Sequence, residues 1–517
     1  MGVGFLTGPH LFLHGLANAE RRCRRGDGRA PERYDLLSSH TVRRPVLLAF
    51  HAAVIALAVG LAYVPDMGKG LVKDDFRWIA ESRVRSWTDA QHLLTSDNGF
   101  YRPVVSLSFA ANEAVAGAHP MPYAATNLLL VVACALALFG LCRALRMEAG
   151  AALMAVGLWV LNPHGISGLI MWISGRTSSL VTLLAVLAGI ALLKERRFLA
   201  GVLCFLALLS KEEAFLLPFV LVAWAGWQKA FPHWDWRRAG RLGWPALASL
   251  APYLALRGQT HAYLPSTAPS YYRLAVSPAL VGRNFLEYAD RSATLTLAVL
   301  VVMLLATRRR PGLSRDDIQR VALGAVWVVG GFGLTLFLPA RSSLYVCLPS
   351  IGVAVAGATA GRSLWSRAGP RQRAGLLAAA ALVPLLLVPV LHARNGRMRS
   401  AARLSTTVLA QLQDVWRAIP PGGALVLVDA PTQRPNLRES FGSLVGDALA
   451  LATGDAIAAS FSPSPDAWTE AQLKKRTTAT PFSVEQWRLE NDRLVRDEAS
   501  TEGQGLERGE TARPSVP

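Results

Sequence analysis

Long apolar runs separated by short polar connections dominate the chain between residues 45 and 392. A helix needs about 20 such residues to cross the hydrocarbon of a bilayer, and most of the runs come close to that length. We therefore expect a mainly α-helical, polytopic membrane bundle. The runs predict about eleven spans: 45–64, 122–142, 149–162, 177–193, 197–210, 214–229, 242–257, 290–307, 319–338, 344–361 and 373–392.

The polar connections alternate in charge, and this alternation predicts the orientation of the spans. Every second connection is strongly basic, and the connections between them carry more aromatic and hydrogen-bonding residues. Basic connections stay in the cytoplasm by the positive-inside rule. We expect a multi-pass protein of a cell membrane, such as a bacterial inner membrane, with a cytoplasmic N-terminus and an outer C-terminal segment. The basic connections hold Arg143 and Arg146, Lys194 to Arg197, Arg237 to Arg241, Arg308 to Arg310, and Arg362 to Arg373.

The composition agrees with a membrane protein, since 52% of the residues are hydrophobic and only 17% are charged. The net charge of +19 would suit a nucleic-acid partner, but the basic residues lie mainly in the short connections, where they set topology. We therefore expect no nucleic-acid role. The five cysteines form neither a CxxC site nor a disulfide framework, which indicates free buried thiols.

The two ends of the chain are polar and differ from the apolar middle. Residues 1–43 read as a basic cytoplasmic arm, and 44–392 as the membrane domain. Residues 393–498 predict a small outer α/β domain, with a helix over 397–418 and a strand over 424–428. A hairpin is expected where 483–489 and 493–495 flank Asn491-Asp492, and residues 499–517 are expected to be disordered.

The first predicted outer loop, residues 65–121, carries the adjacent acids Asp74 and Asp75. Carboxylates beside a membrane are costly to desolvate, which favours a functional role such as a general base. A solvated pair or a helix cap explains them equally well. The residues from Phe76 to Leu94 then repeat apolar positions at helical spacing, which predicts an amphipathic helix lying in the membrane interface.

Basic residues also occur on the predicted outer face, where the positive-inside rule disfavours them. They are Arg102, Arg176, Lys211 and Arg341. The fork of a guanidinium donates two parallel hydrogen bonds to a phosphate, so these four side chains are candidates for holding an anionic headgroup. Taken singly, each is more often a snorkelling anchor. Four together favour the phosphate site.

Other chemistry finds less support in the residues. The tyrosine-rich outer loop 258–289 suits stacking on a sugar ring or an interfacial belt equally. His164 and His261 have no HxxH or HExxH context, and no phosphate-binding glycine loop follows a strand. The sequence therefore demands no metal or other cofactor, although a divalent ion bridging carboxylate and phosphate is compatible with it.

An ordered set of short motifs resembles the membrane half of the multi-span GT-C glycosyltransferases. More closely, it is similar to the protein O-mannosyltransferase-like proteins that carry tetratricopeptide repeats. The resemblance covers roughly residues 45–392 and has no repeats. Its motifs are Asp74-Asp75, Tyr101-Arg102-Pro103, Thr126 to Leu129, Trp172 to Arg176, Ser210-Lys211-Glu212, Leu344-Tyr345 and Leu348 to Ser350.

This resemblance implies transfer of a sugar from a polyprenyl-phosphate carrier to an acceptor hydroxyl outside the membrane, usually with inversion. It implies that Asp74 or Asp75 is the base, and we prefer Asp75. The four basic residues would bind the donor phosphate. The residues expected at the substrate are Tyr101, Trp172, Glu212 and Tyr345.

Three positions depart from the motifs of that family. Ala124 stands where a histidine is common, Gly168 replaces a glutamate, and Ser178 replaces an aspartate. The partners expected are membrane lipids, the lipid-linked donor, and a protein, lipid or glycan acceptor. Two alternatives stay open, a transporter of lipid-linked saccharides and a catalytically inactive scaffold. A transporter would favour charged residues at mid-span, and the predicted spans carry almost none.

Overall fold

The computed structural model describes residues 35–95, 99–263, 267–419, 424–429, 434–453, 459–462 and 484–496. Most of the predicted arm, with Cys23, and the predicted tail after residue 498 lie outside these ranges. The chain divides into two compact units, residues 1–50 and 51–517. The described part of the first unit is the start of helix α2 (Asp35–Tyr63), and every other described element belongs to the second unit.

Helices make up most of the second unit, and each predicted span coincides with one or two of them. Five described segments are long and apolar enough to cross a membrane: Pro45–Tyr63, Pro120–Ala144, Ile173–Leu193, Pro278–Thr307 and Pro370–Arg417. The number of crossings remains a prediction. The helices after α2 in this part are α6 (Pro120–Ala144), α7 (Ala149–Val160), α9 (Arg176–Leu193), α10 (Arg197–Leu208), α11 (Leu217–Trp227), α12 (Trp236–Ala248), α13 (Leu250–Gly258), α14 (Pro278–Thr307), α15 (Arg315–Phe332), α16 (Ser350–Ser366) and α17 (Pro370–Ala418).

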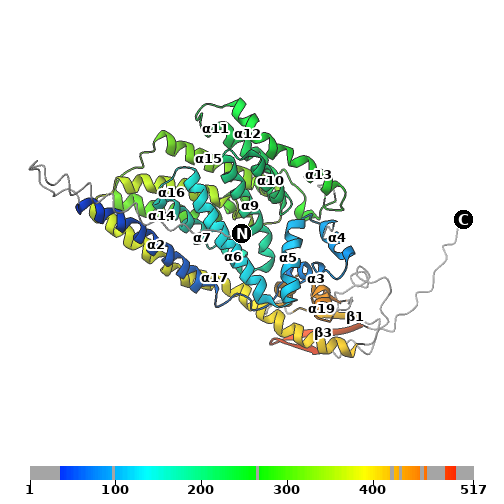
Figure 1. Ribbon diagram of the computed structural model, residues 1–517. Coiled ribbons are helices and arrows are strands. Elements are labelled where there is room, and N and C mark those ends of the chain that lie inside the picture. Colours follow the sequence, from blue (N-terminus) through cyan, green and yellow to red (C-terminus); the bar gives the residue numbers. More distant parts are fainter. Residues whose placement is uncertain are drawn as a thin grey trace, which may run out of the picture. The chain divides into compact units, whose positions relative to one another are not determined.

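Neighbours along the chain pack side by side in this bundle (Figure 1). Helix α9 contacts α6 and α10, while α16 contacts α7, α14 and α15. The core is apolar, and Cys134, Cys142, Cys204 and Cys347 are free and buried in it, as predicted. One short α-helix and several short 3₁₀ helices (η) connect the long helices: α8 (Ile166–Met171), η1 (Ile173–Gly175), η2 (Glu212–Leu216), η3 (Ser270–Tyr272), η4 (Thr335–Phe337) and η5 (Ser343–Val346).

Helix α17 links the bundle to the C-terminal segment without a break. It has 49 residues, so at 1.5 Å per residue it is about 70 Å long, more than twice the hydrocarbon thickness. The predicted span 373–392 and the predicted outer helix 397–418 are therefore parts of one helix. Its far end contacts strand β4 (Arg493–Arg496) and helix α19 (Val445–Thr453) (Figure 1).

The C-terminal segment forms the predicted small α/β unit. Its sheet has the order β2-β1-β3-β4, in which β1 (Ala424–Val428) pairs in parallel with β2 (Ala459–Ser462) and β3 (Val484–Glu490). Strands β3 and β4 form the predicted antiparallel hairpin. Its turn residues Asn491 and Asp492 both have positive φ, as a tight two-residue hairpin turn requires.

The predicted first outer loop, residues 65–121, holds three helices, where the sequence predicted one. Helices α3 (Asp75–Glu81) and α4 (Trp87–Thr95) divide the amphipathic stretch, and α5 (Pro103–Ala116) follows. The stretch is interrupted because Ser86 and Asp89 exchange side-chain-to-backbone hydrogen bonds, a capping box that starts a new helix at α4. Helix α4 keeps an exposed apolar surface, since Trp87 is 77% exposed.

Helix α3 does not present its apolar side to lipid. Phe76 stacks on Phe441 of helix α18 (Leu437–Phe441) with ring centroids 5.5 Å apart, and Ile79 is completely buried. These residues share one hydrophobic core with α5, α17 and the sheet. This core fixes the N-terminal end of α3, where the acidic pair lies.

Candidate functional site

Asp75 is buried and has a structural position. Its Oδ1 accepts hydrogen bonds from the backbone N–H (2.8 Å) and the hydroxyl (2.6 Å) of Ser174, and its Oδ2 accepts one from Val72 N–H (3.0 Å). Only 1% of the residue is exposed. Burial raises the pKa of Asp75 to about 7, although these donors favour the ionised form. Oδ1 thus ties α3 to η1 and Oδ2 holds the turn before α3, which leaves Asp75 poorly placed to meet an acceptor.

Asp74 lies beside it but is accessible to solvent. The protein crowding this carboxyl raises its pKa, and nearby positive charges, led by Arg77 and including Arg102, partly offset the rise. A base must reach its substrate, so accessibility decides between the two acids. The structure therefore favours Asp74 over Asp75 as the candidate general base.

Arg102 is the cation that the structure holds most firmly near Asp74. Its Nε (3.0 Å) and Nη2 (2.6 Å) both donate to Oε2 of Glu212, and its guanidinium lies 4.2 Å from the ring centroid of Phe100. Arg257 Nη1 approaches the other oxygen of Glu212 at 3.5 Å. The result is an Arg102–Glu212–Arg257 network whose central carboxylate orients two guanidinium groups.

The electrostatics of this network favour full ionisation. Burial alone would raise the pKa of Glu212, but its pairing with Arg102 outweighs burial and lowers it. Burial would likewise lower the pKa of Arg102, and Glu212 raises it instead. The side chain of Arg102 is thus preorganised, and 13% of it stays exposed.

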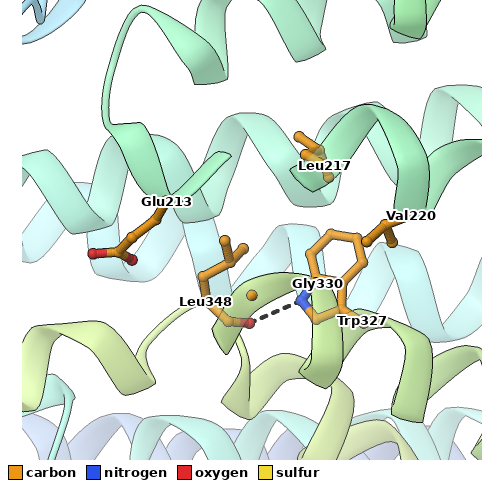
Figure 2. Close-up of a pocket in the computed structure, with 7 residues that line it drawn as sticks. Glu213, Leu217, Val220, Trp327, Gly330 and Leu348 are labelled. Atoms are coloured by element: carbon orange, nitrogen blue, oxygen red, sulfur yellow. Dashed lines mark hydrogen bonds between the residues drawn. The ribbon is translucent and has the colours of Figure 1, made fainter. Parts of the chain in front are cut away.

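Lys211 lies next to this network but is enclosed. Its ammonium donates to Ser178 Oγ at 2.6 Å, forms an ion pair with Glu213, and lies 5.1 Å from the ring centroid of Tyr345. Burial raises the pKa of Glu213, which the charge of Lys211 opposes. Figure 2 shows the Glu213 carboxylate at the edge of an apolar pocket that Leu217, Trp327 and Leu348 help to line.

Tyrosines surround the accessible side of the network. Tyr272 packs its ring edge-on against Phe100, with centroids 5.0 Å apart, and its pKa is raised by burial, with Arg102 opposing and the charge of Asp74 adding to the rise. Tyr345 is partly buried, and its ring lies against the ammonium of Lys211. Tyr101, in contrast, is only 4% exposed and belongs to the bundle core.

Arg176 is a structural residue in this conformation. It is fully buried, and its guanidinium donates to Asn127 Oδ1 (3.0 Å), to Ser108 O (3.0 Å) and to Tyr123 O (3.2 Å). Trp172, four residues before it, packs against Val72 and against Ala401 and Ala402 of α17. The structure therefore denies Arg176 the access to a ligand that the sequence predicted, whereas Trp172 stays partly exposed and its role remains a prediction.

Replacing Arg176 by alanine should destabilise the protein. The change removes buried hydrogen bonds and leaves Asn127 without its donor, a loss of roughly 2–4 kcal/mol in the free energy of unfolding. Thermal unfolding of the purified protein in detergent measures this effect. Arg371→Ala, at an exposed position of α17, is the matched control and should leave Tm unchanged. Equal melting temperatures for both variants would contradict the structural role.

Arg341 is exposed and forms an ion pair with Glu287 of α14, so it does not join the Arg102–Glu212–Arg257 network. The sequence reasoning missed Arg257, because it fell at the end of a predicted span. An arginine that ends an apolar helix on the face where basic residues are disfavoured was the signal that would have found it. Among the described residues, no group of three or more histidine, cysteine or acidic side chains is placed to hold a metal ion.

Among the comparisons with known proteins, only the search of solved structures found a similar fold. The sequence matches no protein-family model and no curated protein. Two solved structures are similar, ArnT from Cupriavidus metallidurans in the apo state and the same protein bound to undecaprenyl phosphate. They are 14% and 15% identical to this chain, with a TM-score of 0.50, and each match covers 83% of this chain and 87% of the other. The chain has a GT-C-like fold. At such low identity the likeness concerns the fold alone.

Proposed function

We propose that this protein is a membrane glycosyltransferase that moves a sugar from a polyprenyl-phosphate carrier to an acceptor hydroxyl. The observation that carries the proposal is an accessible carboxylate, Asp74, close enough to Arg102 for the charge of that guanidinium to lower its pKa, while Glu212 fixes the guanidinium. The GT-C-like fold supports it, as does the undecaprenyl phosphate bound by one ArnT structure. The finer resemblance to O-mannosyltransferase-like proteins rests on the sequence motifs.

In the proposed reaction, Asp74 accepts the proton of the acceptor hydroxyl as its oxygen attacks C1 of the sugar. The C1–O bond to the phosphate breaks, and its electron pair stays on the phosphate oxygen. Attack from the opposite face inverts the configuration at C1. Arg102 and Arg257 stabilise the charge that grows on the departing phosphate, an electrostatic contribution that is commonly the largest in such reactions.

The neighbouring residues position these groups. Asp75 holds the start of α3 against η1 through Ser174, and so sets where Asp74 lies. Lys211 and Glu213 support the adjoining turn η2, which carries Glu212. Tyr272 and Tyr345 would contact the sugar or phosphate on the accessible side. We propose that the site faces the extracytoplasmic side, in keeping with the charge pattern of the connections.

An assay of sugar transfer by the purified protein tests this proposal. The full chain is reconstituted in lipid vesicles with a radiolabelled polyprenyl-phosphate hexose and, in parallel, with the same hexose as a nucleotide sugar. A panel of lipid, glycan and peptide hydroxyl acceptors is supplied to both. Transfer or slow hydrolysis from the lipid-linked donor alone is the expected result. Transfer from the nucleotide sugar alone would overturn the proposal.

A further inference from the structure

A second group of cations lies at the same end of the bundle, outside the Arg102–Glu212–Arg257 network. Three arginines share one carboxylate, Glu287 of α14. Arg291 approaches it at 3.1 Å, Arg283 at 3.8 Å, and Arg341 also pairs with it. One carboxylate neutralises one of three guanidinium groups, so positive charge is left over here.

A fourth arginine, Arg394 of α17, adds to this surplus. Its Nη2 lies 3.0 Å from Nδ1 of His164. Arginine can only donate, so Nδ1 accepts and His164 is the neutral tautomer protonated at Nε2. Burial lowers the pKa of His164, and the charges of Arg394 and Arg291 act in the same direction, with Asp290 opposing. The imidazole thus orients Arg394 without adding charge.

The backbone beneath this group is firmly held. Asn162 is only 4% exposed, and its side-chain amide donates to the carbonyl oxygen of Arg291 at 3.0 Å. Helices α14 and α17 contact each other directly. We call Arg283, Arg291, Arg341 and Arg394, with His164, the Arg291–Arg394 cluster.

The sequence around the cluster places it at the depth of lipid headgroups. In α14 the stretch without charged residues begins just after Arg291, and in α17 the apolar stretch ends at Leu391, three residues before Arg394. Large apolar side chains on both helices are exposed, including Leu297 at 58% and Val390 at 53%, as expected of a surface that faces lipid. Cations that border such a surface meet the phosphate layer of the bilayer.

We propose that the Arg291–Arg394 cluster binds the phosphate of an anionic phospholipid from the surrounding leaflet. This inference rests on the cluster alone and not on the proposed transfer reaction. The guanidinium groups supply paired donors to the phosphodiester oxygens, and Glu287 leaves enough positive charge for one anion. The acyl chains of the lipid would lie along the exposed apolar faces of α14 and α17.

Lipid selectivity of the full chain tests the proposal. Spin-labelled phosphatidylglycerol and phosphatidylcholine are compared in vesicles, and the fraction immobilised at the protein gives their relative association constants. Wild-type protein should prefer phosphatidylglycerol. The double variant Arg291→Gln with Arg394→Gln should lose roughly tenfold of that preference. Arg371→Gln with Arg373→Gln, at the start of α17 and on the far side of its apolar stretch from Arg394, is the matched control and should keep it.

A variant that should increase the preference for phosphatidylglycerol distinguishes a specific effect from a general loss of folding. Glu287→Gln removes the competing carboxylate and should strengthen the preference. Inorganic phosphate at millimolar concentration should not displace the spin-labelled lipid. The proposal is overturned if the double variant keeps full selectivity, if Glu287→Gln weakens it, or if free phosphate competes and so reveals a site for a soluble anion.

Discussion

Asp74→Asn should lower the turnover number for sugar transfer by about 10²–10⁴-fold, the range that a positioned general base contributes. The amide has nearly the same shape but cannot accept the proton of the acceptor hydroxyl. Because Asp74 is exposed, the melting temperature should stay unchanged. Steady-state kinetics with a lipid-linked hexose donor, together with thermal unfolding, measure both effects.

Two matched variants separate catalysis from structure. Asp75→Asn replaces a carboxylate that accepts from Ser174 and Val72, so one oxygen acceptor is lost and Tm should fall. Asp414→Asn changes an exposed acid of α17 whose ion pair with Arg417 is open to solvent, and should affect neither activity nor Tm. Normal turnover by Asp74→Asn would refute the assignment of the base.

The pH dependence adds an independent test of the same carboxyl. Only ionised Asp74 is a base, and crowding by the protein raises its pKa above the usual range. The ratio kcat/KM should therefore fall on the acidic side in proportion to the ionised fraction. Asp74→Asn should lack this acidic limb in its residual activity. An identical acidic limb in wild type and variant would assign the titration to another group.

The sequence predicted the helical part of this fold well because the bilayer imposes a length and an apolar composition on each span. Every predicted span coincides with a helix, and the strand over 424–428 and the hairpin at Asn491-Asp492 are confirmed. The amphipathic stretch from Phe76 to Leu94 was predicted less well. Hydrophobic periodicity alone does not reveal the Ser86–Asp89 capping box, which divides the one predicted helix into α3 and α4.

The candidate site was predicted by residue type but not by accessibility. The sequence placed Arg102 and Glu212 on one predicted face, and the structure pairs them, since motifs on successive connections converge at one end of a bundle. It could not show that Asp75 and Arg176 are enclosed by polar partners, because Ser174 and Asn127 come from other helices. Arg257 was missed for a related reason, as its pairing with Glu212 exists only in three dimensions.

Arg102→Ala should lower turnover by roughly 10²–10³-fold, the loss found when one preorganised donor to a developing negative charge is removed. Arg102 is oriented by two hydrogen bonds to Glu212 and by the ring of Phe100, so it needs no reorganisation as the phosphate departs. The donor KM should rise as well, because the same guanidinium binds the ground-state phosphate. Arg102→Lys should recover only part of the rate, since an ammonium cannot reproduce the paired donors.

Glu212→Gln distinguishes orientation from charge in this network. The amide still accepts one hydrogen bond from Arg102 but no longer fixes both guanidinium groups, so turnover should fall less than in Arg102→Ala. If Glu212 acts only through Arg102 and Arg257, adding Glu212→Gln to Arg102→Ala should cost much less than it does alone. Fully additive losses would mean that Glu212 contacts the substrate itself. Wild-type turnover by Arg102→Ala would place the phosphate elsewhere.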